Sequence, residues 1–427
     1  MTVFVFLASL VGAMALGMPI AFALLVCGVA LMLYLGIYDS QILAQNLIIG
    51  ADNFQLLAVP FFLLAGELMN AGGLSKRIVN FAVAFVGHIH GGLGYVAIFG
   101  AVIMASLSGS AAADTAALAA ILIPMMREAG YNVPRSAGLI AAGGIIAPVI
   151  PPSIGFIIFG VAANVSITQL FLAGIVPGLM MGVALVIAWA WVVRGENVKT
   201  YPRAPWSVRL RSFIDGFFAL MMPVMILGGI KFGVVTPTEA AVLAAVYAMV
   251  IGMFVYRELK PAHLYRVLLL AAKTSAVVMF LVAAALVSAW LITQANIPAE
   301  LGTMLGPLME HKTLLLVGMM LLVLVVGSAL DFAPTVLILT PVLMPIVKQA
   351  GIDPVYFGVL FIMNNAIGLL TPPVGVVLNV VCGVARVPMG AVIRGVAPFL
   401  FAQIVVLFLL VMFPVLVTGP LAWLRGR

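Results

Sequence analysis

The sequence predicts an all-α polytopic membrane protein built from two inverted repeats. Of its 427 residues, 65% are hydrophobic and 8% are charged, whereas a soluble globular domain carries about 25% charged residues. With a mean hydropathy of +1.29, most of the chain must face lipid or the interior of a membrane bundle. A soluble protein is therefore excluded. The 42 glycines and 25 prolines indicate helices that break inside the membrane.

The two halves of the sequence match when one is shifted along the other by 221 residues. This shift, the repeat offset, superimposes the Pro-Pro dipeptide at 151–152 on the one at 372–373. It also superimposes a break rich in small residues at 106–110 on a second break at 327–331. Breaks of the same kind in the same order indicate a structural repeat.

The first repeat is expected over residues 1–193. Its central apolar run has about 37 residues, and one helix of that length would measure roughly 55 Å, well beyond the ~30 Å core of a bilayer. A re-entrant hairpin that turns at the break fits better, and the Pro-Pro dipeptide interrupts the helix after it. In order, we expect scaffold helices (1–75), an amphipathic arm helix along the interface (76–88), the hairpin (93–129), the broken helix (134–165) and a last helix (168–193).

A polar segment at 194–213 is expected to link the repeats on the cytoplasmic side. The second repeat is expected over residues 214–427 with the same order of parts. These are scaffold helices (214–295), an arm helix (297–310), a hairpin (312–350), a broken helix (354–384) and a last helix (391–418).

Lysine and arginine residues predict the topology, because cytoplasmic loops of membrane proteins are enriched in them. The loop expected at 39–52 has no base, and the next turn carries Lys76 and Arg77. In the second half the turn at 297–310 has no base, so the halves are expected to run in opposite senses. A cytoplasmic linker places 14 of the 20 basic residues inside and both termini outside. The net charge of +7 is thus explained by topology, and no basic stripe indicates nucleic acid.

The first hairpin tip offers oxygen ligands near the middle of the membrane. Small residues let the backbone turn tightly, and hydroxyls and freed carbonyls can replace the hydration shell of Na⁺. The prolines opposite the tip leave further carbonyls unpaired. A carboxylate buried in a membrane is usually functional, although capping of the returning helix is an alternative role. The candidate Na⁺-binding residues are Ser106, Ser108, Gly109, Ser110, Asp114, Pro151, Pro152 and Ser153.

The second tip repeats this arrangement. The helices that restart after the two Pro-Pro breaks point the positive ends of their dipoles at the tips, which suits a substrate carboxylate. Close packing of small residues in lipid is the alternative explanation for either tip alone, and the recurrence of all three parts in both halves favours ion sites. The second set of candidate Na⁺-binding residues is Gly327, Ser328, Asp331, Asn364, Asn365, Thr371, Pro372 and Pro373.

Three polar residues at the end of an apolar helix, Thr293, Gln294 and Asn296, are candidates for a substrate vestibule. A plain helix exit is the alternative interpretation. The histidines and cysteines form no metal-ligand pattern, so we expect no cofactor and no metal other than Na⁺ as coupling ion.

Several long motifs resemble the large membrane subunit of tripartite ATP-independent periplasmic (TRAP) transporters, the DctM-like family, and the segment pattern is most similar to members that handle sugar acids such as diketogulonate. The resemblance runs nearly end to end. The motifs are LAVPFFLLAGELMNAGGLSKRI (57–78), SLSGSAAADTAA (106–117), PPSI (151–154), TPTEAA (236–241) and GLLTPPVG (368–375).

The resemblance implies a permease of the bacterial inner membrane that imports an organic acid, namely a dicarboxylate, sialic acid or a sugar acid, and is driven by a Na⁺ gradient. It implies an elevator motion, in which the hairpins and broken helices move together against the scaffold. A periplasmic binding protein would deliver the substrate, and a small four-helix membrane subunit, here a separate polypeptide, would be the partner. By motif, Na⁺ ligands would come from 106–110 with 151–153, and from 327–331 with 371–373, many of them backbone carbonyls.

Three other functions remain open at this stage. A Na⁺/carboxylate symporter would work without a binding protein. An ion channel would conduct without coupling, but the Pro-Pro breaks fit alternating access better. An intramembrane aspartyl protease would use Asp114 and Asp331 as a proton-sharing pair, yet the repeat offset aligns Asp331 with Ser110 instead.

Overall fold

Helices form the regular structure in the described residues, 2–296 and 306–425, of the computed structural model. Within these residues there is no strand, and eight helices are long and apolar enough to cross a membrane. The prediction of an all-α, multi-pass membrane protein is therefore confirmed.

The scaffold of the first half is a series of short helices. Asp39 begins one of them, because its carboxylate accepts a hydrogen bond from the Gln41 N–H at 2.7 Å. Asn53 begins the next in the same way, with its side-chain oxygen 2.9 Å from the Gln55 nitrogen. The elements are α1 (Thr2–Ala15), α2 (Ile20–Leu35), α3 (Ser40–Ala51), the 3₁₀ turn η1 (Phe54–Leu57) and α4 (Ala58–Ala71).

The scaffold of the second half has fewer and longer helices. These are α11 (Trp206–Lys231), α12 (Pro237–Val250), the π-helical turn η3 (Ile251–Val255) and α13 (Pro261–Gln294). Thr236 and Glu239 form a complete capping box at the start of α12. The repeat offset maps Ser40, the first residue of α3, onto Pro261, the first residue of α13. The single helix α13 thus corresponds to α3, η1 and α4 together.

Each half contains a helical hairpin followed by a broken helix and a long helix, as predicted. In the first half these are α6 (Gly92–Ser108) with α7 (Ala111–Glu128), α8 (Val133–Gly144) with α9 (Ile154–Ala163), and α10 (Ile167–Val192). In the second half they are α16 (Lys312–Ala329) with α17 (Phe332–Gln349), α18 (Pro354–Gly368) with α19 (Val376–Ala385), and α20 (Met389–Met412), after which α21 (Val415–Leu424) ends the described chain. Both Pro-Pro bonds are cis.

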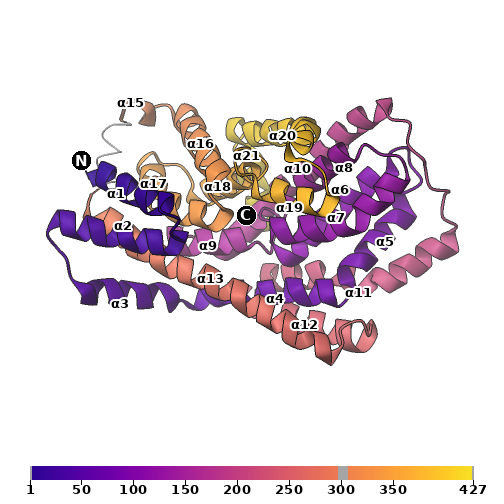
Figure 1. The fold of residues 1–427 in the computed structure, drawn as a ribbon, viewed down its shortest axis with the longest axis horizontal. Coiled ribbons are helices and arrows are strands. Elements are labelled where there is room, and N and C mark those ends of the chain that lie inside the picture. The colour runs from indigo at the N-terminus through magenta and orange to yellow at the C-terminus, as the bar shows by residue number, and fades with distance from the viewer. Residues whose placement is uncertain (1, 297–305, 426–427) are drawn as a thin grey trace.

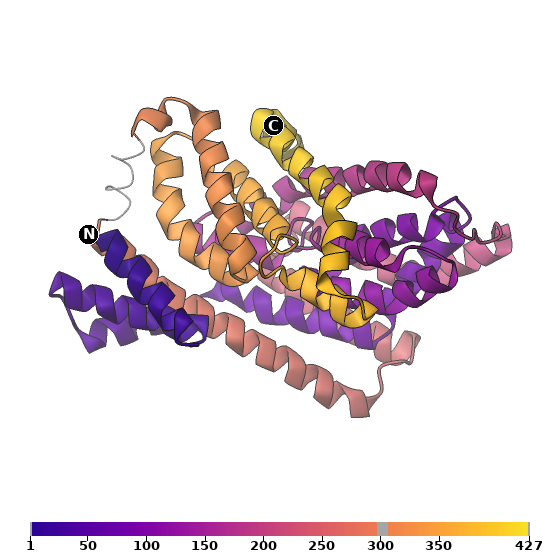
Figure 2. The same cartoon turned by 45° about the horizontal axis from the view of Figure 1, so that its top comes forward.

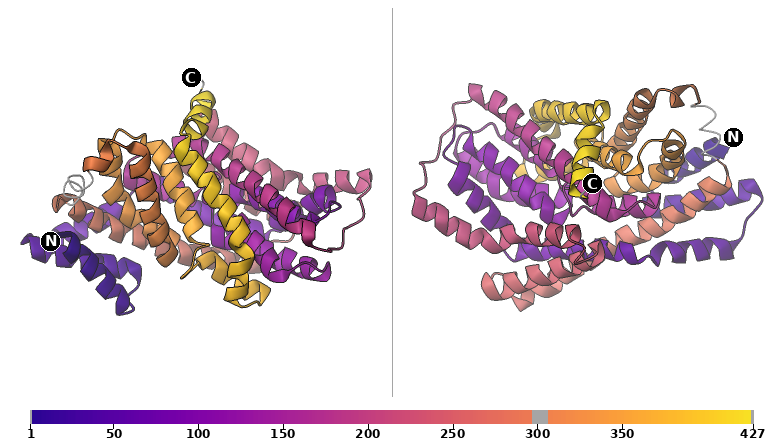
Figure 3. Two further views of the ribbon diagram at one scale, coloured as in Figure 1. Left: turned by 90° about the horizontal axis from the view of Figure 1, so that it is seen from above. Right: turned by 180° about the vertical axis from the view of Figure 1, so that it is seen from behind.

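The two halves are interlocked. α9 packs against α17, and α19 packs against α7 and α8, so that the second part of each broken helix contacts the hairpin of the other half. The scaffold is reciprocal too, because α2 packs on α13 and α12 packs on α4. Figures 1 and 2 show the two hairpins on opposite sides of the centre of the molecule, α16 and α17 in orange and α6 and α7 in purple. The long helix α13 runs beneath both with α3 and α4, and α10 and α20 lie side by side (Figure 3).

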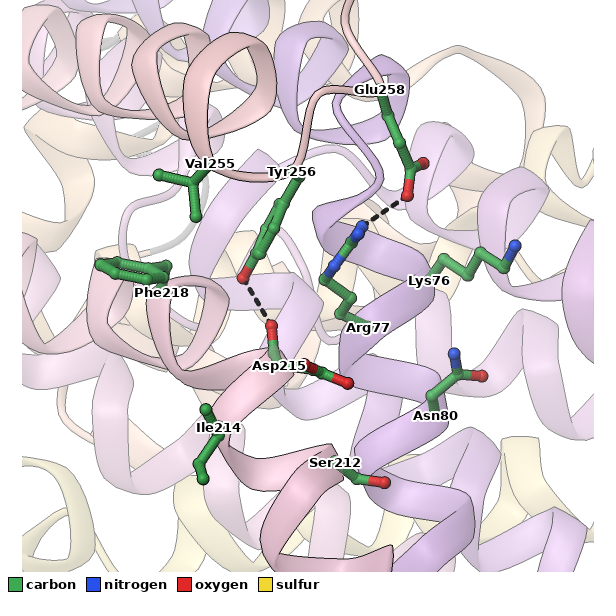
Figure 4. A pocket seen from close by; sticks show the side chains of 10 residues that line it. All are labelled: Lys76, Arg77, Asn80, Ser212, Ile214, Asp215, Phe218, Val255, Tyr256 and Glu258. Carbon is green, nitrogen blue, oxygen red and sulfur yellow. Dashed lines mark hydrogen bonds and ion pairs between the residues drawn. The ribbon is translucent and has the colours of Figure 1, made fainter.

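The arm helix α5 (Leu74–Val86) is held to the scaffold by its basic residue Arg77. One guanidinium nitrogen of Arg77 lies 2.7 Å from a carboxylate oxygen of Glu258, and the guanidinium carbon lies 3.7 Å from the centre of the Tyr256 ring. The Tyr256 hydroxyl in turn donates to the Asp215 carbonyl at 2.8 Å. Figure 4 shows these groups around a cavity of about 550 Å³ between α5, α11 and the end of η3.

Three expected segments differ from the structure. The prediction of a loop at 39–52 was wrong, since this segment forms α3. The linker is shorter than 194–213, because the chain makes the short turn η2 (Val193–Gly195) and α11 already begins at Trp206. The second arm, 297–310, lies mostly outside the described residues, and its described end forms α15 (Gly306–Met309).

Candidate functional site

The first hairpin turns at Gly109. Its φ of +63° is in the left-handed region that glycine adopts most easily. Ser110 then starts α7, with its hydroxyl oxygen accepting a hydrogen bond from the Ala113 N–H at 3.4 Å. The Gly-Ser pair therefore reverses the chain at the tip.

Asp114 lies in the first turn of α7 and is 1% exposed. The Ser108 hydroxyl donates to its Oδ1 at 2.5 Å, and the same hydroxyl accepts from the Ser110 N–H at 3.1 Å. The other carboxylate oxygen, Oδ2, is buried without a hydrogen-bond partner in the described residues. Because an unpaired carboxylate oxygen is costly to bury, this atom is a ready ligand for a cation.

The first tip lies directly against the proline break. A Cβ added to Gly109 would be 2.8 Å from the Pro152 carbonyl oxygen, so only glycine lets the two segments approach this closely. Ser153 begins α9 beyond the break: its hydroxyl accepts from the Phe156 N–H at 3.1 Å and donates to the Pro148 carbonyl at 2.5 Å. The structure thus brings together the tip and the break, as the sequence predicts.

The second tip also meets its proline break. The Val374 N–H donates to the Ser328 carbonyl at 3.2 Å, and Asp331 begins α17 by accepting a hydrogen bond from the Phe332 N–H at 2.7 Å. Unlike Asp114, Asp331 is exposed. Its side chain has the capping role that was the alternative for both carboxylates.

Asn365 supplies the unpaired oxygen of the second site. Its Nδ2 donates to the Phe332 carbonyl at 2.9 Å, while its buried Oδ1 finds no partner in the described residues. Gly327 lies close by, since a Cβ there would be 2.7 Å from this oxygen. Asn364, one residue earlier, donates to the Met320 carbonyl at 2.5 Å and so joins α18 to α16.

The two sites differ in exposure and in their remaining candidates. The first break is buried, whereas Pro372 and Pro373 in the second are exposed. Three hydroxyls turn back to carbonyls of their own helices, namely those of Ser106 (Ile103, 2.6 Å), Ser328 (Val325, 2.8 Å) and Thr371 (Ile367, 3.0 Å). These three hydroxyl protons are therefore already used in hydrogen bonds within the protein.

The vestibule candidates lie at the end of α13 and directly after it. Thr293 and Gln294 are exposed at the end of α13, and Asn296 follows with a φ of +57°. The Thr293 hydroxyl donates to the Ala289 carbonyl at 3.0 Å. In the described part of the chain, two cavities lie beside the first hairpin, and none of these three residues contributes to their linings.

Sequence reasoning missed two buried threonines. The hydroxyl oxygen of Thr115 is buried beside Gly144 with no hydrogen-bond partner in the described chain. Thr335 occupies the position that the repeat offset pairs with Asp114, and its hydroxyl donates to the Asp331 carbonyl at 2.9 Å. Applying the repeat offset to Asp114 would have found Thr335.

Two hairpin tips set against two broken helices inside a polytopic helical protein define a membrane transporter. The chain belongs to the family described as tripartite ATP-independent periplasmic transporter, DctM component, whose model matches residues 7–416. It is 55% identical, over the full length of both chains, to the 2,3-diketo-L-gulonate TRAP transporter large permease protein YiaN of Escherichia coli strain K12. It is 39% identical to the sialic acid TRAP transporter large permease protein SiaM of Vibrio cholerae, covering 94% of each chain.

Among solved structures, the chain is similar to the YdaH transporter of Alcanivorax borkumensis, described as having an unusual topology. The TM-score is 0.63 at 16% sequence identity, with 89% of this chain and 88% of the other covered. The likeness supports the fold. The family is one of transporter permeases, so the chain is a TRAP transporter large permease subunit and not an aspartyl protease.

Proposed function

We propose that this permease subunit imports an organic acid by Na⁺-coupled, elevator-type secondary transport. One Na⁺ site lies between the first hairpin tip and its broken helix, and a second lies at the equivalent place in the second half. The hairpins and broken helices carry the bound ions and substrate past the scaffold.

The observation that carries this proposal is a buried oxygen without a partner at each tip. Asp114 Oδ2 in the first half and Asn365 Oδ1 in the second are both buried and lack hydrogen bonds in the described residues. Each adjoins the turn of a hairpin and a run of backbone carbonyls freed by prolines. Hard oxygen ligands of this kind suit a bare Na⁺, whose charge also compensates the carboxylate.

Two relatives support a proposal for the substrate class. They are named as permeases for 2,3-diketo-L-gulonate and sialic acid, and both compounds carry one carboxylate and several oxygen groups. We propose a sugar acid of this type. The positive N-terminal ends of α9 and α19 favour its carboxylate near the tips.

The family supports a tripartite assembly in a membrane. We propose a small four-helix membrane subunit as a separate polypeptide, and a periplasmic binding protein that delivers the acid. The basic residues favour a cytoplasmic linker, so both termini would lie on the periplasmic side of the bacterial inner membrane.

Transport in proteoliposomes tests the proposal. Vesicles that hold this chain and its small partner subunit, with the cognate binding protein outside, should accumulate the acid only when Na⁺ is in excess outside. Choline replacing Na⁺ is the control for ionic strength, and vesicles with the small subunit alone are the control for leakage.

Two results would count against it. Uptake that continues after the Na⁺ gradient is collapsed would contradict Na⁺ coupling. Uptake at full rate without any binding protein would favour the alternative of an independent Na⁺/carboxylate symporter.

A further inference from the structure

A polar cavity lies between the scaffold and the first hairpin. It has a volume of about 450 Å³, within the range of roughly 300–1,000 Å³ found for small-molecule sites. α4 and α5 supply one wall and α7 supplies the other. Its lining residues are Glu67, Asn70, Ser75, Lys76, Ala113, Ala116, Ala117 and Ile121.

All the polar groups of the cavity belong to the scaffold side. Glu67 and Asn70 are three residues apart on α4 and so share a face. The Ser75 hydroxyl donates to Asn70 Oδ1 at 2.5 Å, which fixes the amide and leaves its two N–H groups for another acceptor. Lys76 adds an ammonium group at the start of α5.

The two charged groups of the cavity have no ion-pair partner. Among the described residues, ion pairs join Arg77 to Glu258 and Arg135 to Glu196, and neither involves Glu67 or Lys76. Lys76 is exposed and also lines the cavity beside Tyr256; Figure 4 shows its side chain pointing away from Tyr256, toward which its neighbour Arg77 points. An unpaired ammonium beside a cavity is available to an anion.

The hairpin wall is made of small apolar residues, and it adjoins the candidate Na⁺ site. Ala113, Ala116 and Ala117 lie on one side of α7, and Ala113 directly precedes Asp114. If α7 moves with its hairpin, this wall moves while the polar groups stay on the scaffold. The cavity would then have this shape only while the hairpin tip keeps its present position relative to the scaffold.

We propose that this cavity is a release-side subsite for the substrate, selective for a hydroxylated monocarboxylate. Lys76 and the Asn70 amide bind the carboxylate as donors, and Glu67 accepts hydrogen bonds from the hydroxyl groups. A second carboxylate would face Glu67, and the like charges would repel. The alanine wall contacts the C–H face of the ligand. The subsite rests on the proposed function, and on the cytoplasmic placement of Lys76.

Ligand binding to the purified complex of this chain with its small partner subunit tests the subsite. D-gluconate is the hydroxylated monocarboxylate probe and succinate is the dicarboxylate probe, each titrated at fixed Na⁺ while the melting temperature is followed. The wild type should bind gluconate at least tenfold more tightly than succinate. Lys76→Gln should weaken gluconate at least tenfold, and Lys76→Arg should restore most of the affinity. Glu67→Gln should reduce the preference for gluconate over succinate at least tenfold.

Matched control variants separate the site from general charge effects. Lys273→Gln removes an exposed charge from α13, and Glu128→Gln removes one from the end of α7. Both should keep the wild-type affinities. The melting temperature of each variant without ligand reports whether it folds.

The outcome separates the subsite from the transport function. If the wild type accumulates the acid on a Na⁺ gradient while Lys76→Gln and Glu67→Gln keep both dissociation constants within twofold, the subsite is overturned and the function stands. A wild type that binds succinate as tightly as gluconate overturns the selectivity. A wild type that accumulates no acid, in spite of a cognate binding protein, overturns the function itself.

Discussion

Asp114→Asn is the most direct perturbation of the first candidate Na⁺ site. Asparagine keeps the size of the side chain and the oxygen that accepts from Ser108, at 2.5 Å in the wild type. It replaces the unpaired Oδ2 by an amide and removes the negative charge. Because the carboxyl group is 1% exposed, water can compensate little of either change.

The magnitude follows from the loss of a charged ligand. An interaction with a charged group is worth about 1.5–3 kcal/mol, and every 1.4 kcal/mol is a factor of about ten in affinity. The Na⁺ concentration for half-maximal transport should therefore rise roughly 10- to 100-fold. In the absence of Na⁺, Asp114→Asn should instead stabilise the protein, because the variant no longer buries an uncompensated charge. A rise of roughly 2 °C or more in melting temperature is expected in Na⁺-free buffer.

Two assays on the same preparation check this pair of effects. Uptake in proteoliposomes over a range of Na⁺ concentrations gives the half-maximal value, and thermal unfolding with Na⁺ or choline gives the stabilisation by the ion. Asp353→Asn is the matched control, since Asp353 caps α18 through the Tyr356 N–H at 2.7 Å and asparagine preserves that cap. It should change neither measurement.

A purely structural role for Asp114 makes a different prediction. If the carboxylate only anchors the tip through Ser108, asparagine keeps that hydrogen bond, so the variant should show an unchanged Na⁺ dependence of uptake and no stabilisation specific to Na⁺-free buffer. That combination would refute the assignment of Asp114 as an ion ligand.

Two further variants test the second tip and the arm. Gly327→Ala places a Cβ 2.7 Å from Asn365 Oδ1 and should weaken Na⁺ binding through about 1–3 kcal/mol of overpacking. Gly318→Ala is the control on the same helix, because its Cβ meets only open space, and it should leave Na⁺ binding unchanged. Equal Na⁺ titrations of the two variants would contradict the second site. Arg77→Gln should destabilise the protein by about 1 kcal/mol through loss of the Glu258 pair and the aromatic stacking. Thermal unfolding of both single variants and of the double variant with Glu258→Gln should show less than additive losses, and additive losses would count against the pair.

The hairpins and broken helices could be predicted from the sequence because their signals are local. A left-handed turn needs Gly109, and a proline removes an N–H wherever it stands. The repeat offset then located the second copy from the first. Local chemistry of this kind acts in the same way before and after folding.

The scaffold and the polar cavity could not be predicted in the same way. The segment at 39–52 has few strongly apolar stretches, which is typical of a loop, yet α13 packs along α3 and supports it as a helix. Glu67 and Asn70 are isolated polar residues in an apolar run, and nothing in the sequence around them predicts a binding site. They line a cavity only together with Lys76 and the alanines of α7. Such partners come together only through the tertiary fold.

The crossed packing of the two halves gives a physical route for coupling between the sites. α9 begins at the first proline break, where the tip residue Gly109 touches Pro152, and it packs against α17 of the other half. The ring of Phe332, next to Asp331, lies against Gly155 in the first turn of α9. An ion that fixes the first tip therefore also fixes the start of α9, and with it the wall against which the second hairpin turns. Because this contact joins the two candidate sites through a single helix turn, occupancy of one site should favour occupancy of the other.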